Sequence, residues 1–388
     1  MLFNLFHLMP WQYLPADFDE KHASSSLTLP NGIFDPELGS QLYHSYLDQL
    51  EYAEELGFDG VCVNEHHQTA YGLMPAPNII AGMLARRTER IKIAVVGNAI
   101  ALRDHPLRVA EEIAMLDNVT RGRIISGFVR GIGWEHYAHS LSPTLSRDRF
   151  IEAHDLIVKA WTSTDVFEWH SPHYHFRYVN VWPRPFQQPH PPIWVPGTGS
   201  RETMHWVAEH RYTYLSVYAP ARVIKLWFDG FRAAAAGVGY EPEPEQIGLL
   251  IPIFVAETDE KARTQARQHV EWLYHKGMKI TGELYFPAGY LSPGSLRGLL
   301  TSGVKPFHQT SFEELVEERY VILGSPSSVA DQLDTLRTEL GFGNLCALLQ
   351  FGDMGHEQAI HNMELFAGEV MPRFRSERSG VLEAPAVS

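Results

Sequence analysis

The chain has 388 residues, of which 45% are hydrophobic, so it can bury a large core in one or more domains. Its formal net charge of −14 argues against nucleic acid or an anionic membrane as the main partner. The first residues lack the features of a signal peptide, and no apolar run approaches the about 18 residues that a membrane-spanning helix needs. Two cysteines, Cys62 and Cys346, lie in apolar runs and are expected to be buried free thiols. These features predict a soluble, cytoplasmic protein.

Short apolar runs alternate with amphipathic helical patterns along the chain. The expected strands are Phe3–Met9, Asp59–Asn64, Ile91–Ala101, Arg123–Arg130, Ile193–Thr198, Tyr212–Val217, Ile247–Ala256 and Leu345–Phe351. The expected helices are Leu42–Leu56, Pro75–Arg90, Pro106–Val119, Leu145–Trp161, Ser200–Glu209, Ala221–Ala236, Asp259–Lys276 and His356–Val370. Near-continuously apolar runs are typical of parallel strands covered on both faces. Eight such units predict an α/β fold, a (β/α)8 TIM barrel, with a doubly wound open sheet as the rival architecture.

Two stretches interrupt this repeat. Residues 164–192 are rich in His, Trp and Pro, and residues 277–323 are longer and less regular. Loops beyond about 15 residues in a compact domain are usually functional, so both insertions are expected to cover the C-terminal face of the barrel. We expect residues 1–375 to form a single domain that contains these insertions, and residues 376–388 to be a disordered tail.

Residues with possible chemical roles follow the second and third predicted strands, at the end of the barrel where TIM-barrel enzymes carry their active sites. His66 and His67 end the second strand, and strand alternation points them to opposite faces. A histidine suits a general base, although a structural histidine under a loop is the alternative. Gly97 and Asn98 follow, and the Asn98 amide can meet the polar edge of a planar heterocycle. An ordinary turn is the alternative there.

Two turns that suit an anion follow the fourth and fifth strands. The Arg130 guanidinium, beside a glycine-rich turn, suits a phosphate through charge-assisted hydrogen bonds. Thr198, Gly199 and Ser200 open a helix whose free N–H groups and dipole favour an anion. Neither turn completes a dinucleotide-binding GxGxxG pattern. The presence of two such turns on consecutive strands indicates instead a ligand with one terminal phosphate. No convincing metal-ligand set, serine-hydrolase elbow or P-loop occurs.

Several short motifs occur together in this chain. They are EELGFDG (54–60), NEHH (64–67), YGL (71–73), LRDHPLRVAEE (102–112), LDNVTRGR (116–123), VWPRP (181–185) and GSPSSVA (324–330). The combination resembles the bacterial-luciferase-like flavin monooxygenase family. The similarity covers most of the chain and is weakest over residues 277–323.

This resemblance implies a TIM barrel that binds FMN at the C-terminal ends of its strands, commonly as a homodimer packed through the second and third helices. It makes His66 the catalytic residue and places a non-proline cis peptide at Gly97-Asn98. It implies that Arg130 and residues Thr198, Gly199 and Ser200 bind the flavin phosphate, and that Tyr137 contacts the flavin. Around the end of the first strand, His7, Met9 and Trp11 indicate an apolar pocket for the substrate, with ordinary packing as the alternative.

The implied activity is the oxidation of a small, largely apolar substrate, such as an aldehyde or ketone, by FMNH2 and O2 through a C4a-peroxyflavin. Long lids over an apolar mouth would exclude water from such a site. The missing dinucleotide pattern indicates that a separate flavin reductase supplies FMNH2. The alternatives are a dehydrogenase that uses F420 or FMN without oxygen chemistry, and a flavin-binding protein without turnover.

Overall fold

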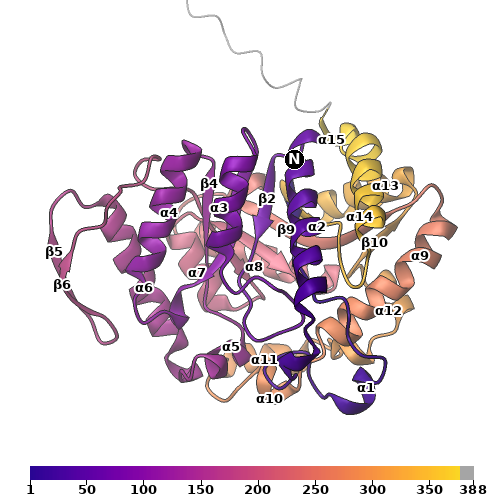
Figure 1. Ribbon diagram of the computed structural model, residues 1–388. Coiled ribbons are helices and arrows are strands. Elements are labelled where there is room, and N and C mark those ends of the chain that lie inside the picture. Colours follow the sequence, from indigo (N-terminus) through magenta and orange to yellow (C-terminus); the bar gives the residue numbers. More distant parts are fainter. Residues whose placement is uncertain (376–388) are drawn as a thin grey trace, which may run out of the picture.

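A closed barrel of eight parallel strands is the centre of the molecule, and its helices lie outside (Figure 1). The computed structural model describes residues 1–375, so the segment 376–388, expected as a tail, lies outside the described residues. The barrel strands are β1 (Leu2–Phe6), β2 (Gly60–Val63), β3 (Lys92–Ala99), β4 (Ile124–Val129), β7 (Ile193–Gly197), β8 (Thr213–Val217), β9 (Ile247–Val255) and β11 (Asn344–Leu348). The predicted TIM barrel is confirmed.

The strands follow one another around the barrel in chain order. Pairing of β8 with β9, and of β11 with both β9 and β1, completes the ring. Because every pair is parallel, the C-terminal ends of all eight strands meet on one face. The first two strands are shorter than predicted, since β1 ends at Phe6 and β2 ends at Val63. The loops after them therefore carry the polar motif residues.

The outer helices match the predicted ones with shifted ends. They are α2 (Pro36–Glu55), α3 (Pro77–Arg87), α4 (Leu107–Thr120), α6 (Ser146–Thr162), α7 (Arg201–Glu209), α8 (Ala221–Gly237), α9 (Asp259–Glu271) and α14 (His356–Leu365). The π-helical turns η5 (Trp272–Gly277) and η7 (Phe366–Val370) extend α9 and α14. Helix α2 begins before the predicted Leu42 because the Asp35 side chain accepts the N–H groups of Glu37 and Leu38. An Asp cap followed by a proline is a typical helix start.

Short helices occupy the connections. They are α1 (Phe18–Lys21), η1 (Asn31–Ile33), η2 (Ile100–Leu102), α5 (Gly133–Ala138), η3 (Pro143–Leu145), η4 (Pro244–Gln246), α10 (Gly282–Tyr285), α11 (Pro293–Thr301), η6 (Phe307–Gln309), α12 (Phe312–Glu317) and α15 (Pro372–Arg375). Within residues 1–375, no helix combines the length and the apolar character that a membrane crossing requires.

Two apolar clusters form the core, and strand alternation separates them. One cluster lies between the strands and the helices and contains residues such as Leu5, Val61 and Ile93. The other extends from the barrel interior to α9 and α12, and its strand residues include Phe6, Cys62, Ala94, Ile125, Trp194, Leu215, Leu250 and Leu348. Cys62 and Cys346 are buried free thiols, as predicted.

The insertion at residues 164–192 forms a hairpin of β5 (Phe167–His170) and β6 (His175–Val179). It packs on α6, where the Lys159 ammonium lies 4.4 Å from the centre of the Phe167 ring. Figure 1 shows the hairpin at the outer side of α6. Its tip contacts the loop after β3, where the Tyr174 hydroxyl donates to the Arg103 carbonyl at 3.2 Å and the Phe176 ring lies 4.8 Å from that of His105. The coverage of the C-terminal face by this insertion stays a prediction.

The insertion at residues 277–323 does reach the C-terminal end of β4. The Tyr290 hydroxyl donates to the Gly131 carbonyl at 2.7 Å, and the Tyr285 carbonyl oxygen would lie 2.4 Å from a Cβ at Gly133. This insertion leads into a strand and a helix that were not predicted, β10 (Ile322–Gly324) and α13 (Pro326–Leu340). Strand β10 extends the sheet by pairing with the last three residues of β9.

Candidate active site

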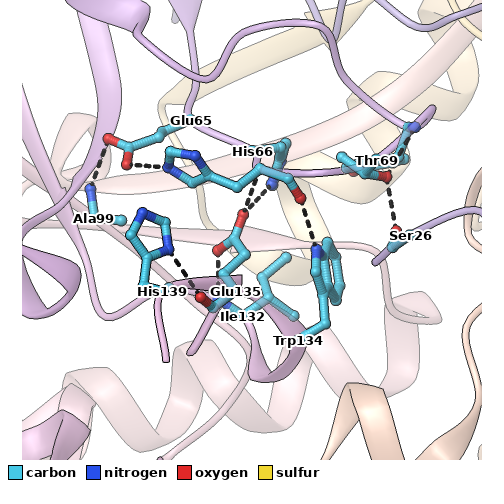
Figure 2. Close-up of polar contacts among 12 residues, drawn as sticks. Ser26, Glu65, His66, Thr69, Ala99, Ile132, Trp134, Glu135 and His139 are labelled. Carbon is cyan, nitrogen blue, oxygen red and sulfur yellow. Dashed lines mark hydrogen bonds and ion pairs between the residues drawn. The ribbon is translucent and has the colours of Figure 1, made fainter. Parts of the chain in front are cut away.

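Two adjacent histidines follow β2 and engage different carboxylates. The Nδ1 atom of His66 lies 3.2 Å from Glu135 Oε1, a contact drawn in Figure 2. The Nε2 atom of His67 lies 2.6 Å from Glu65 Oε1. The opposite directions expected for the two side chains are therefore present, although both residues lie beyond the end of the regular strand.

Of the two, His66 lies beside the barrel interior. Its ring contacts Tyr71, with 4.8 Å between ring centres, and Tyr71 belongs to the apolar cluster inside the barrel. The His67 ring instead packs at 4.4 Å against His139. Its partner Glu65 also accepts a hydrogen bond from Arg103 at 2.7 Å, which makes that side a closed polar network. His66 is thus the histidine that a molecule in the barrel mouth would meet.

Glu135 of α5 is the residue that holds His66, and the sequence patterns did not single it out. Its carboxylate is buried and also accepts the N–H groups of Ile132 at 2.7 Å and His67 at 3.3 Å. Burial alone would raise the pKa of Glu135, but hydrogen bonds from His66 and Ile132 and the charge of His66 keep it below its ordinary value. Glu135 therefore stays ionised, and its carboxylate orients the His66 ring.

An anion-binding arrangement follows β4 on the same loop that leads to Glu135. The Arg130 guanidinium donates to the Tyr290 carbonyl at 3.0 Å and lies 4.1 Å from the centre of the Tyr290 ring. A second arginine, Arg147 of α6, donates to Ser200 Oγ at 3.1 Å and to Thr203 Oγ1 at 3.4 Å. Burial and the charge of Arg130 both lower the pKa of Arg147, so the two cations share one region. Arg147 was not predicted from the sequence.

The predicted turn at the start of α7 completes this region. Ser200 caps the helix by accepting the Thr203 N–H, and Thr198 is exposed. Gly199 has a φ of +84°, and a Cβ there would lie 2.0 Å from Trp227 Nε1, so only glycine fits. Two guanidinium groups beside a helix N-terminus match a phosphate monoester in charge and in donors. The terminal phosphate of FMN therefore fits this region.

A carboxylate also lies there. Glu202 accepts the Ser200 hydroxyl at 2.8 Å. Burial alone would raise the pKa of Glu202, but its own backbone N–H, the hydroxyls of Ser200 and Ser292, and Arg147 lower it to about 2. The negative charge of the Glu202 carboxylate therefore partly offsets the positive charges of Arg130 and Arg147.

Helix α5 contributes one further polar group near Arg130. The His136 side chain is buried, and its Nε2 has no hydrogen-bond partner among residues 1–375. Burial and the charge of Arg130 lower the pKa of His136 to about 4, so the ring is neutral at neutral pH. The predicted flavin contact Tyr137 lies next to it with 45% of its surface exposed.

The Gly97 and Asn98 segment is at the end of β3. The cis peptide joins Val96 to Gly97, one peptide earlier than expected. A Cβ at Gly97 would lie 2.7 Å from the Gly127 backbone, so the two strands approach closely there. The Asn98 side chain pairs with Asn78 of α3 at 3.0 and 3.3 Å. Only the backbone of Asn98 is left to meet a heterocycle, and its flavin role remains a prediction.

The three predicted substrate residues lie under α2. His7 is fully buried, with Nε2 2.9 Å from Gln49 Oε1 and Nδ1 accepting the Met9 N–H at 2.9 Å. Burial lowers the pKa of His7 to about 4. Met9 and Trp11 belong to the cluster between strands and helices, whereas Leu8 belongs to the barrel interior. This placement does not favour a substrate role for His7, Met9 and Trp11, which stays an untested prediction.

Three of the buried polar atoms that have no hydrogen bond among the described residues belong to residues just beyond the C-terminal end of a strand. They are Asn64 Oδ1, just after β2, Gln350 Oε1, after β11, and the Tyr218 hydroxyl, after β8. Asn64 and Gln350 lie two residues beyond Cys62 and Leu348 of the interior cluster, so alternation places them on the interior side. A molecule in the mouth would meet these atoms above an otherwise apolar interior.

Comparisons with known proteins agree with this arrangement. Residues 26–343 match the family described as luciferase-like monooxygenase. The oxygenase component of the flavin-dependent trigonelline monooxygenase of Acinetobacter baylyi is 24% identical over 353 residues, which cover 89% of this chain and 94% of that protein.

Two solved structures share the fold over nearly the whole chain. A monooxygenase from Streptomyces bottropensis has a TM-score of 0.74 and 25% identity, covering 96% of this chain and 100% of that chain. The oxygenating constituent of 3,6-diketocamphane monooxygenase from Pseudomonas putida, solved in complex with FMN, has a TM-score of 0.74 and 18% identity. The superposition covers 96% of this chain and 98% of that chain.

Proposed function

Because the chain belongs to the luciferase-like monooxygenase family, we propose that it is the cytoplasmic oxygenase of a two-component system. It would use FMN reduced by a separate reductase, together with O2, to oxidise a small, largely apolar substrate. The observation that carries this proposal is the presence of both the His66–Glu135 pair and the Arg130–Arg147 cation pair at the C-terminal end of the barrel. Reduced FMN, when bound, supplies the electrons that activate O2.

The chain's own residues would bind the cofactor and manage protons. Arg130, Arg147 and the α7 N-terminus would hold the phosphate through charge-assisted hydrogen bonds. His66 Nδ1 faces Glu135, which leaves Nε2 as the atom that takes or gives a proton in the mouth. The ionised Glu135 stabilises the imidazolium form while that proton is held.

The barrel interior would select the substrate. Its walls are apolar, and the insertion over the end of β4 would help to keep water out. Burial raises the pKa of Tyr218, so its hydroxyl, which faces Tyr71, stays protonated and can donate to a carbonyl oxygen. These features support an aldehyde or a ketone as the substrate class.

The purified protein alone is expected not to oxidise NADH or NADPH when catalytic FMN is present, because its anion-suited turns lack the dinucleotide pattern. Oxygen uptake that depends on an added aldehyde or ketone should appear once a flavin reductase is supplied. The measurement is NAD(P)H absorbance and dissolved oxygen, with reductase alone as the control. Efficient NAD(P)H oxidation by the protein alone would contradict the two-component proposal. Substrate reduction by reduced F420, without oxygen uptake, would replace the oxygenase by a dehydrogenase.

We also propose that the protein is a homodimer that packs through α3 and α4. These neighbouring helices expose four large apolar side chains, Ile79, Met83, Met115 and Val119, with exposures of 45 to 61%. The double variant Met83→Lys with Met115→Lys should dissociate the dimer, because charges would be buried without partners. Light scattering after gel filtration measures the mass. Leu226→Lys on α8 is the matched control, and a double variant that stays dimeric would exclude this interface.

A further inference from the structure

A cluster of metal-ligating side chains lies outside the barrel, away from His66 and Arg130. His154 on α6 is 2% exposed, and its Nδ1 lies 2.9 Å from Asp155 Oδ1. His210 follows the last residue of α7. One ligand atom from each of His154, Asp155 and His210 lies within 4.8 Å of the other two. Three potential ligands from two helices thus converge on one point.

Hydrogen bonds fix how these rings present their nitrogens. His210 Nδ1 lies 2.8 Å from the Trp206 carbonyl oxygen, which requires an N–H at Nδ1 and leaves the lone pair on Nε2. His154 Nε2 lies 2.9 Å from the Tyr212 hydroxyl, which leaves Nδ1 on the side of Asp155. Metal-binding histidines usually donate their second N–H to a carbonyl or another polar group in this way.

Aromatic packing holds the two imidazoles in place. The Trp206 ring centre lies 4.6 Å from that of His154 and 4.5 Å from that of His210. The Tyr212 ring stacks on His210 at 5.2 Å. Little side-chain entropy remains to be lost when a ligand binds.

We propose that His154, Asp155 and His210 form a binding site for a divalent transition metal of the zinc type. Two imidazole nitrogens and one carboxylate oxygen are a donor set that Zn²⁺ accepts, with a fourth position open to water. Tetrahedral ligands at about 2.0–2.1 Å from the metal lie about 3.3 Å apart, so the cluster must contract slightly. Asp155, whose side chain is 49% exposed, has the freedom to do so.

The bound metal would join α6 to the turn between α7 and β8. This position is on the outer helices, so its effect is on stability and not on the oxidation in the barrel mouth. The Asp155 carboxylate and the two neutral imidazoles give the occupied site a net charge of about +1, since the metal carries +2.

The test uses the full-length, tag-free protein, dialysed against a chelator and titrated with ZnCl2 in competition with a chromogenic zinc indicator. We expect one Zn²⁺ per chain. His210→Ala and Asp155→Asn should each weaken binding by at least about 10- to 100-fold, the range seen when even an outer-shell partner of a metal ligand is lost. His205→Ala is the matched control, because His205 is an exposed histidine of the same helix. Circular dichroism checks that each variant is folded.

Thermal unfolding gives a second readout that does not depend on the indicator. Zn²⁺ should raise the melting temperature of the wild type and of His205→Ala, and should leave that of His210→Ala unchanged. The proposal is wrong if His210→Ala binds Zn²⁺ as tightly as the wild type. It is equally wrong if the wild type binds no Zn²⁺ at micromolar concentrations, or if His205→Ala weakens binding as much as His210→Ala.

Discussion

His66→Ala is expected to lower turnover of the reduced-FMN-supplied enzyme by about 10²–10⁴ while FMN affinity stays nearly unchanged. The variant removes the ring that Glu135 orients beside the barrel interior, so no side chain remains there to manage the proton. The anion site at Arg130 and Arg147 is left intact. Product formation gives the turnover, and quenching of flavin fluorescence gives the affinity.

His67→Ala is the matched control, one residue along the chain. Its ring belongs to the closed network with Glu65 and Arg103, so its loss should act mainly on stability. Glu135→Gln should give a turnover between those of the two histidine variants, because the His66 ring remains but loses the carboxylate that orients it. If His67→Ala abolishes turnover while His66→Ala is nearly normal, the assignment of His66 is wrong.

Arg130→Ala is expected to weaken FMN binding by about 1.5–3 kcal/mol, which is roughly 10- to 150-fold in the dissociation constant. A charge-assisted contact to the phosphate is lost. Arg147→Ala should have a similar effect, since its guanidinium shares the region. The melting temperature of the flavin-free protein should change little in both variants. Fluorescence titration with FMN measures the effect.

Two controls separate a phosphate contact from a general disturbance. Riboflavin has no phosphate, so both arginine variants should bind it as the wild type does. Glu202→Gln removes the anion beside Ser200 and should tighten FMN binding, the opposite direction. Unchanged FMN affinity in Arg130→Ala would remove that residue from the phosphate site.

Much of the fold could be predicted, because each barrel strand is an apolar run and each outer helix has its own periodicity. The exceptions have physical causes. Strand β10 has three residues and is stabilised by its pairing with β9, so no local pattern marks it. Helix α13 was overlooked although Ser325 caps it and Gly341 ends it in a left-handed conformation, both of which are readable signals. The β5–β6 hairpin is stabilised by contacts to α6.

Candidate site residues that directly follow a barrel strand could be predicted from the sequence. Those contributed by helices could not. His66, Arg130 and Ser200 follow strands, and their position together with their side-chain chemistry marked them as candidates. Glu135 and Arg147 reach the mouth from helices, and nothing in their neighbourhood in the sequence indicates those partners. The expected absence of metal ligands rested on spacing along the chain. Spacing along the chain does not reveal His154 and His210 as neighbours, because they are far apart in the sequence and come together only in the folded protein.

If Arg130 binds the flavin phosphate as proposed, its contact with Tyr290 would couple cofactor binding to the position of the long insertion. Tyr290 accepts from the guanidinium, packs its ring on it, and donates to Gly131. A phosphate that takes a hydrogen bond from Arg130 Nη1 would compete with the Tyr290 carbonyl for that nitrogen. By thermodynamic reciprocity, whatever tightens the insertion onto Arg130 weakens the hold on the phosphate by the same free energy. The packing of the insertion on Arg130 and the binding of the flavin would then be opposing states of one coupled equilibrium.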